Sequence, residues 1–390
     1  MRRLLSTLLF LAVSLPALGG TSPEMLRIES KILGEVRNAV VRLPPSYSTG
    51  NRSYPVLYMT DGDWQLPHTA ATADFLARQG RMPEVIIVGI INTDRTRDLT
   101  PTHVEATNVE GMTYEFPTSG GGDRFLAHVA SELIPAVEEK YRTTPFRFFA
   151  GHSFGGLFAL HSMMERPKLF KAWIAVSPSL NWDNGYIFKR AEEFFEKQKE
   201  LHASLVVTMG NEGPTNDEAM KRLEQQLDAA QTKGLDYRFI HFDDEDHGSV
   251  VLPSHYAAFR KVFDGWRYTI PAKADPKSLY PAVTQHYARL SDRFGYTIPI
   301  PEVTANAIGY RLLSADLMDD AIAVFKANVG AYPQSANVYD SLGEAYEKAG
   351  RMTDAKANYE IAVKNAKKRN EPALETYKRN YDRAAKAARK

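Results

Sequence analysis

The chain has 390 residues, 44% of them hydrophobic, and contains no cysteine. Its formal net charge is +1 at pH 7, so no charge excess indicates a nucleic acid or an anionic membrane as a partner. The lack of cysteine excludes disulfides, thiolate metal sites and a cysteine nucleophile, while the length allows one large core and a smaller appendage.

The first twenty residues have the pattern of a secretory signal. Arg2 and Arg3 precede an apolar stretch, and Ala17-Leu18-Gly19 fits the small-x-small pattern of a cleavage site. The stretch is short for a spanning helix, which needs ~20 residues, and an uncleaved anchor is the alternative. We therefore expect a signal peptide at residues 1–20 and a periplasmic or secreted protein that has no membrane span after cleavage.

The chain then alternates strand-like and helix-like segments. Strands are predicted at 38–44, 54–62, 84–92, 146–151, 171–178, 203–211 and 237–245, and helices at 124–141, 156–167, 215–233 and 253–264. The unbroken apolar run 84–92 is typical of a strand covered on both faces. The alternation predicts an α/β fold with a mostly parallel sheet, in which ligands bind beyond the carboxyl ends of the strands.

Residues 151–155, Gly-His-Ser-Phe-Gly, match the G-x-S-x-G pattern of a nucleophile elbow. The pattern requires a strand before it and a helix after it, and both are predicted here. Its glycines permit a sharp turn that exposes the Ser153 hydroxyl, and the Phe154 N–H points to where an oxyanion would form. An ordinary glycine-rich turn is the alternative to this nucleophile.

A serine nucleophile needs a base, and in this type of fold the chain order is serine, acid, histidine. His247 lies in a loop just after the last predicted strand, where the base is expected. His241 belongs to that strand itself, and His255 and His161 fall in predicted helices. We therefore predict that His247 is the base, with a solvated loop histidine as the alternative.

The acid is expected after the preceding strand, 203–211. Glu212 follows this strand directly and Asp217 comes five residues later, so Glu212 is preferred because it is nearer the strand end. The acidic run 243–246 could also orient His247, although a solvated loop explains it equally simply. No H-E-x-x-H or other metal-ligand spacing is present in the sequence, so we expect neither a metal nor a cofactor.

Several stretches together resemble the esterase family of α/β-hydrolases, which contains esterase D, the enterobactin-type siderophore esterases and the mycolyltransferases. The matching stretches are 42–47, 54–63, 95–101, 120–141, 151–160, 177–184 and 246–250. The resemblance covers about residues 25–265, and 95–101 and 177–184 place the enterobactin-type esterases nearest. It implies a Ser-His-acid hydrolase, although some relatives manage with a Ser-His pair. It also implies a second oxyanion donor, the backbone N–H of Asp63 after the Asp-Gly turn.

Three further residues are candidates for substrate binding. Arg95 and Arg97 lie in the loop after the strand that ends at Asn92, and their guanidinium groups could hold an anionic part of the substrate. A salt bridge from Arg97 to Asp98 or another loop carboxylate is the alternative. Trp182 could line the acyl or alcohol pocket, or could simply pack in the core.

The C-terminal part has a different pattern. Prolines interrupt residues 269–302, which suggests a connector with one helix. Beyond it lies a repeat of 34 residues, which pairs Gly309 with Gly343 and Phe325 with Tyr359, among others, and matches the tetratricopeptide pattern. Two repeats are few for independent stability, so we expect 303–390, including its basic last helix, to pack on the preceding domain or to bind a second copy or a partner protein.

These observations predict an α/β-hydrolase domain over residues 21–268 followed by a small all-α, tetratricopeptide-like tail. We expect an exported serine esterase that cleaves a small-molecule ester, siderophore-type or other, through an acyl-enzyme. Acyl transfer to an alcohol by the same triad, or an inactive scaffold with partner-binding repeats, are the alternatives.

Overall fold

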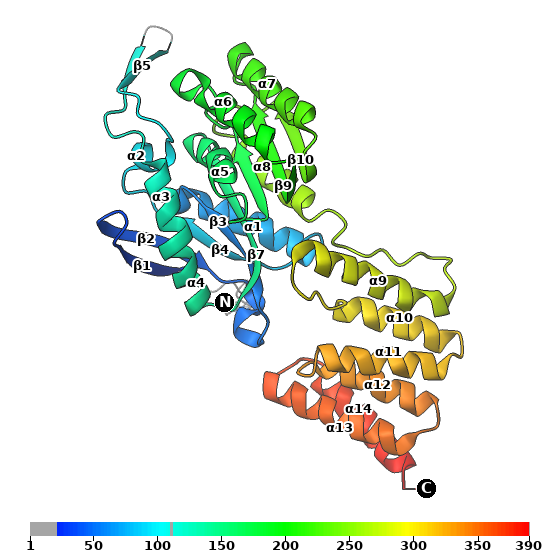
Figure 1. Cartoon of the computed structure of the whole chain (residues 1–390). Coiled ribbons are helices and arrows are strands. Elements are labelled where there is room, and N and C mark those ends of the chain that lie inside the picture. Colours follow the sequence, from blue (N-terminus) through cyan, green and yellow to red (C-terminus); the bar gives the residue numbers. More distant parts are fainter. Residues whose placement is uncertain (1–21, 110–111, 390) are drawn as a thin grey trace, which may run out of the picture.

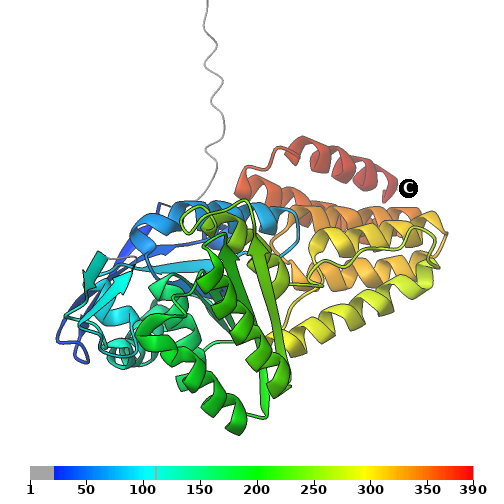
Figure 2. The same cartoon turned by 90° about the horizontal axis from the view of Figure 1, so that it is seen from above.

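The computed structural model describes residues 22–109 and 112–389, so the predicted signal peptide lies outside the described residues. Figure 1 shows a domain built on a central sheet, from which a tail of helices extends. In Figure 2 the yellow-to-red tail lies at one side of the blue-to-green sheet domain.

The central sheet has eight strands in the order β1-β2-β4-β3-β7-β8-β9-β10. The six strands from β4 to β10 are parallel, whereas β1 and β2 are antiparallel to their neighbours. The predicted, mostly parallel sheet is therefore confirmed, and the six parallel strands end at one edge. The strands are β1 (Glu24–Ser30), β2 (Glu35–Arg42), β3 (Tyr54–Met59), β4 (Ile86–Ile90), β7 (Thr143–His152), β8 (Ala172–Val176), β9 (Glu200–Gly210) and β10 (Lys233–Phe242).

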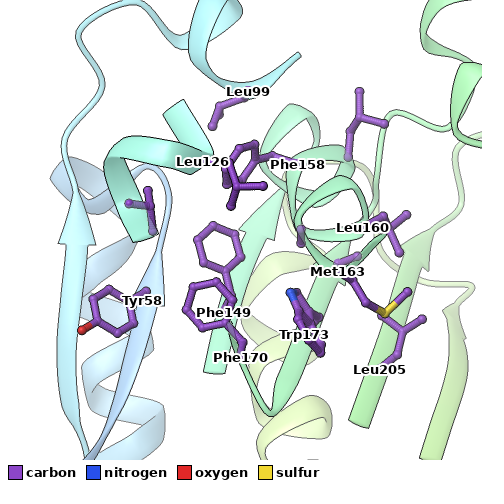
Figure 3. Packing of buried hydrophobic residues seen from close by; sticks show 14 of the residues in the cluster. Tyr58, Leu99, Leu126, Phe149, Phe158, Leu160, Met163, Phe170, Trp173 and Leu205 are labelled. Carbon is purple, nitrogen blue, oxygen red and sulfur yellow. The ribbon is translucent and has the colours of Figure 1, made fainter. Parts of the chain in front are cut away.

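Helices cover both faces of this sheet. Successive residues of a strand point to opposite faces, and β7 shows both layers. Phe149 packs on Phe158 of α5 with ring centroids 5.6 Å apart, and Phe148 packs on Phe259 of α8 at 6.0 Å. Figure 3 shows the first of these layers, where Phe149 and Phe170 lie between the sheet and α5. The helices are α1 (Gly62–Arg78), α2 (Arg95–Leu99), α3 (Gly122–His128), α4 (Ile134–Lys140), α5 (Phe154–Glu165), α6 (Trp182–Lys197), α7 (Pro214–Ala230) and α8 (Val251–Val262).

Three shorter elements complete this domain. A 3₁₀ turn, η1 (Pro45–Thr49), follows β2, and a π-helical stretch, η2 (Val129–Leu133), joins α3 to α4, so that the predicted helix 124–141 consists of three consecutive segments. A separate two-stranded hairpin of β5 (Ala106–Val109) and β6 (Met112–Glu115) projects from the sheet domain (Figure 1).

The tail as the structure has it consists of six helices: α9 (Pro276–Phe294), which lies in the predicted connector, and α10 (Glu302–Ser314), α11 (Met318–Ala331), α12 (Ala336–Lys348), α13 (Met352–Arg369) and α14 (Leu374–Ala387). Two of its hairpins make the same close contact 34 residues apart. A Cβ atom on Gly309 would lie 2.5 Å from the Phe325 ring, and one on Gly343 would lie 2.7 Å from the Tyr359 ring. The absence of a side chain at both positions therefore lets the paired helices approach.

The tail is packed on the sheet domain through α9, which falls in the predicted connector 269–302. The Phe294 ring at the end of α9 lies 4.9 Å from the Phe146 ring of β7 and 5.5 Å from the Phe263 ring that follows α8. One buried apolar cluster runs without a break from Phe148 in the sheet to Tyr359 in the tail. The two parts therefore share a hydrophobic core.

Candidate active site

The Ser153 turn has the geometry of a nucleophile elbow. Strand β7 ends at His152 and α5 begins at Phe154, which confirms the predicted strand-turn-helix order. Between them Ser153 has φ 62° and ψ −116°, a backbone conformation that a residue with a side chain adopts only under strain. A Cβ atom on Gly151 would lie 2.2 Å from the Gly155 carbonyl oxygen, so only glycine fits there.

His247 lies in the turn between β10 and α8, and its ring is paired with Glu212. Its Nδ1 is 2.7 Å from Glu212 Oε2. Glu212 comes two residues after the end of β9, and its side chain is mostly buried, while the His247 side chain is half-exposed. With its Nδ1 proton donated to the carboxylate, the imidazole keeps Nε2 free to accept a proton.

The alternative acid, Asp217, faces a different histidine. Asp217 Oδ1 lies 3.0 Å from His241 Nε2, and Asp243 Oδ1 lies 2.7 Å from the other ring nitrogen of His241. Among the described residues, the acidic run 243–246 forms no hydrogen bond with the His247 ring. Its last residue, Asp246, accepts from the N–H groups of Gly248 and Ser249 and so closes the turn.

The Glu212 carboxylate is held in its ionised form. Burial raises the pKa of Glu212, but the hydrogen bond from His247, the nearby Ser177 hydroxyl and the charge of His247 together outweigh burial, so the pKa lies below the usual glutamate value. A charged Glu212 can orient the imidazole and can stabilise the imidazolium that forms when the base takes a proton.

His152 lies next to Ser153 in the sequence and next to His247 in space. The ring centroids of His152 and His247 lie 4.6 Å apart, and His152 directly precedes Ser153. Among the described residues, Ser153 Oγ has its hydrogen-bond contact with Ser179 Oγ, at 3.4 Å, and not with His247. Catalytic hydrogen bonds are often long before substrate binds, so this arrangement is compatible with a base at His247.

The Asp-Gly turn after β3 lies beside the elbow. The Thr60 N–H donates to the Ala150 carbonyl of β7, and a Cβ on Gly155 would lie 2.2 Å from Thr60 Oγ1. Helix α1 begins at Gly62, which places Asp63 in the first helical turn, where N–H groups have no intrahelical acceptor. The first turns of α1 and α5 therefore supply backbone donors at this end of the sheet.

The two candidate arginines are held by carboxylates of the protein. Arg95 Nε lies 2.7 Å from Oδ1 of the fully buried Asp61, and 31% of the Arg95 side chain is exposed. Arg97 forms salt bridges with Glu35 and Asp98 at 2.5 and 2.8 Å. Arg95 also lies over the Phe154 ring, 5.6 Å from its centroid, and so lies beside the Ser153 turn.

Trp182 is buried, and it packs against the residue that follows the nucleophile. Its ring lies 5.1 Å from the Phe154 ring and 5.2 Å from the Phe116 ring, both edge to face. Its indole Nε1 donates to the side-chain oxygen of Thr102 at 3.1 Å. Trp182 thereby joins the 101–123 segment to the elbow by an aromatic cluster of Phe116, Phe154 and Trp182.

Two residues of this site were not singled out from the sequence. Asp61 is fully buried and accepts from Asn92 and Arg95, and the His152 ring Nε2 lies 2.7 Å from the His247 carbonyl oxygen. Neither has a sequence signal of its own, because each acts through residues that are distant along the chain.

Other functional classes were searched for in the described part of the chain. Within residues 22–109 and 112–389, no group of three or more histidine, aspartate and glutamate side chains could hold a metal ion. No helix in these ranges has the length and apolar character to cross a membrane.

Comparisons with known proteins find related esterases. Residues 30–263 match the model of the family described as "Putative esterase". The ferri-bacillibactin esterase of Bacillus subtilis is 29% identical over 245 residues, which cover 57% of this chain and 83% of that protein. The siderophore enterobactin esterase of Emericella nidulans is 28% identical over 254 residues, covering 54% and 82% of the two chains.

A solved structure has the same architecture. The IroE-like serine hydrolase from Shewanella oneidensis is 28% identical, with a TM-score of 0.68, and the match covers 79% of this chain and 99% of that one. The sheet domain therefore has the α/β-hydrolase fold, as predicted, and an all-helical region follows it.

Proposed function

Because the chain belongs to the Putative esterase family and is a carboxylic ester hydrolase, we propose that it works through a triad of Ser153, His247 and Glu212. The observation that carries this proposal is the strained Ser153 elbow beside a histidine whose Nδ1 is paired with a buried carboxylate. The pairing favours Glu212 over Asp217 as the acid, because Asp217 faces His241.

In this mechanism the Ser153 hydroxyl attacks the ester carbonyl while His247 Nε2 takes its proton. The tetrahedral oxyanion is stabilised by the N–H groups of Phe154 and Asp63, in the first turns of α5 and α1. Collapse of the intermediate expels the alkoxide, which receives the proton from His247, and leaves an acyl-enzyme on Ser153. Water, activated by His247, then hydrolyses that ester.

We propose a siderophore-type ester as the substrate. Two observations support this class: the relatives named above act on siderophores, and the aromatic cluster of Phe116, Phe154 and Trp182 adjoins the nucleophile. Arg95, one-third exposed over the Phe154 ring, supplies a positive charge for an acidic substrate group. The signal-like residues 1–20 support export to the periplasm or the medium.

The test combines labelling with a substrate screen. A fluorophosphonate should modify the full-length protein once, and peptide mapping should locate the modification at Ser153. Turnover of a cyclic trilactone siderophore, a phenolic ester and a short aliphatic ester is then compared. We expect the siderophore to have the highest kcat/KM. Labelling at another residue would contradict the triad, whereas a preference for the aliphatic ester would contradict the substrate class alone.

A further inference from the structure

His152, the residue before the nucleophile, holds the turn that carries His247. Its side chain is buried, and its Nε2 lies 2.7 Å from the backbone carbonyl oxygen of His247, across 95 residues of sequence. The two imidazole planes are tilted by 42° with their centroids 4.6 Å apart, so the rings are also in contact. His152 therefore contacts the backbone and the side chain of the same residue.

The hydrogen bond fixes the tautomer of His152. A carbonyl oxygen only accepts hydrogen bonds, so His152 Nε2 carries a proton and donates it. Burial lowers the pKa of His152 to about 4, and the charge of His247 lowers it too, while the hydrogen bond to the His247 carbonyl and the charge of Asp61 raise it by less. The ring is therefore neutral at pH 7, and it adds no second positive charge beside the base.

The backbone of His152 is held as well. Its carbonyl oxygen accepts from Arg95 Nη2 at 3.0 Å, and the same guanidinium group is paired with the buried Asp61 at 2.7 Å. One residue thus connects three segments: the turn after β3, the nucleophile elbow, and the turn between β10 and α8. All three supply groups to the proposed mechanism.

The anchoring matters because the His247 turn is otherwise secured at few points. The turn lies at the end of β10, which is the edge strand of the sheet, and the His247 side chain is half-exposed. Among the described residues, its other hydrogen bonds to neighbouring segments are the Glu212 pair and the Asn211 N–H bond to the Glu245 carbonyl. The bonds from Gly248, Ser249 and Val250 to Asp246, and from Asp246 to Ser249, lie within the turn itself. Glu212 orients the His247 ring but does not fix the distance between the His247 backbone and Ser153.

We infer that His152 is a positioning residue, which sets the distance between the His247 imidazole and the Ser153 hydroxyl through its hydrogen bond to the His247 carbonyl. The inference rests on the proposed triad and adds that the triad needs the hydrogen bond from His152 to keep its geometry. A misplacement of about 1 Å can cost roughly 100-fold in rate. Because His152 touches the base and not the substrate, its loss should lower kcat and leave KM nearly unchanged.

The test compares four variants of the full-length protein with a small nitrophenyl ester. In His152→Gln the amide Nε2 can reach the position of the imidazole Nε2 and can still donate to the carbonyl. His152→Asn keeps an amide that is too short, and His152→Leu keeps the bulk without a donor. His161→Leu is the matched control, because His161 is also buried, lies on α5 and is bonded to Asp123, away from His247.

We expect His152→Gln to retain kcat within about threefold, and His152→Asn and His152→Leu to lose roughly 10–100-fold in kcat with KM within about threefold. His161→Leu should lower the melting temperature and keep kcat. Unchanged kcat in His152→Asn, or equal losses in the Gln and Asn variants, would overturn the inference. The Gln–Asn comparison remains decisive if the Leu variant fails to fold. Full turnover in Ser153→Ala and His247→Ala would instead refute the triad itself.

Discussion

Glu212 Oε2 lies 2.7 Å from His247 Nδ1, although the two residues are 35 positions apart in the sequence. The pair forms because β9 and β10 are parallel neighbours, so the segments that follow them meet at the same edge of the sheet. A second acid–histidine pair joins Asp217, in the first turn of α7, to His241, near the end of β10. The chain therefore contains its own control for the role of the acid.

Glu212→Gln should reduce kcat far more than Asp217→Asn does. Loss of a triad carboxylate leaves the imidazole in the wrong tautomer or orientation, which can cost up to roughly 10⁴ in turnover. Asp217→Asn removes only the His241 pair and should change kcat by less than about threefold. Nitrophenyl-ester kinetics on both variants check this prediction. The reverse order would assign the acid to Asp217, and small losses in both would favour a Ser-His pair.

Ser153→Ala should abolish ester hydrolysis by several orders of magnitude and leave the fold intact. The hydroxyl is the attacking group, while its one hydrogen-bond contact among the described residues, with Ser179, is long at 3.4 Å. Ser162→Ala is the matched control, because Ser162 is buried on α5 and accepts from Trp173 at 3.0 Å. Steady-state kinetics and circular dichroism check the prediction, and more than a few per cent of activity in a folded Ser153→Ala would contradict it.

The elements that the sequence predicted correctly are those with a local residue pattern. The apolar runs of the parallel strands and the glycine-flanked Ser153 have local patterns that survive in the fold. Helix α1 was not predicted, because Pro67 and polar residues interrupt its apolar spacing. Helix α6 was missed too, and its start includes left-handed residues at 183–185 that no helical periodicity describes.

The contacts of the site were less predictable than its elements. Strand position suggested Glu212 and left Asp217 open, since both follow β9, and only the geometry pairs each acid with a different histidine. The buried Asp61–Arg95 pair depends on the turn after β3 and the α2 segment lying side by side. Such long-range pairs leave no periodic trace in one sequence, so a single chain read alone does not reveal them.

His255 should make the protein less stable in mild acid. Its ring is buried, lies 3.0 Å from Thr69 Oγ1 and has its pKa lowered to about 3 by burial, with His68 and His152 adding to the effect. The unfolded chain binds this proton below pH ~6.5 and the folded chain does not, so stability falls as pH drops from about 6.5 toward 3. This group alone should remove about 2–3 kcal/mol of the free energy of unfolding by pH 4.5.

Urea unfolding between pH 7.5 and 4.5 checks the contribution of His255. His255→Gln should be less stable than the wild type at pH 7.5 but should lose less stability on acidification. His152 is also buried and neutral, so some acid sensitivity should remain. His202→Gln replaces an exposed histidine and should follow the wild-type curve. A His255→Gln curve parallel to the wild type would show that His255 is not the titrating group.

The packing contact between the tail and the sheet domain, here called the joint, should stabilise the protein without taking part in catalysis. Phe294 is buried against Phe146, Phe263 and Trp266, with ring centroids 4.9 to 5.5 Å away. Phe294→Ala should therefore lower the free energy of unfolding by about 3–5 kcal/mol, the usual cost of such a cavity. Its kcat should be unchanged, because none of the proposed catalytic groups lies beyond residue 247.

Truncation near residue 268 removes α9 to α14 and extends the same test. The shortened chain would expose the Phe146 and Phe263 rings, so it should be less soluble and should melt at a lower temperature, while a small ester should still be turned over. Phe325→Ala, which opens a cavity inside the tail beside Gly309, separates damage to the tail from damage to the joint. Melting curves, solution mass and nitrophenyl-ester turnover are compared for the truncated chain, the Phe325→Ala variant and the full-length protein.

Loss of small-ester turnover in a folded, truncated chain would show that the tail contributes to the active site. Unchanged stability would mean that the shared core does not hold the two parts together, and would favour a role of the tail in binding a partner.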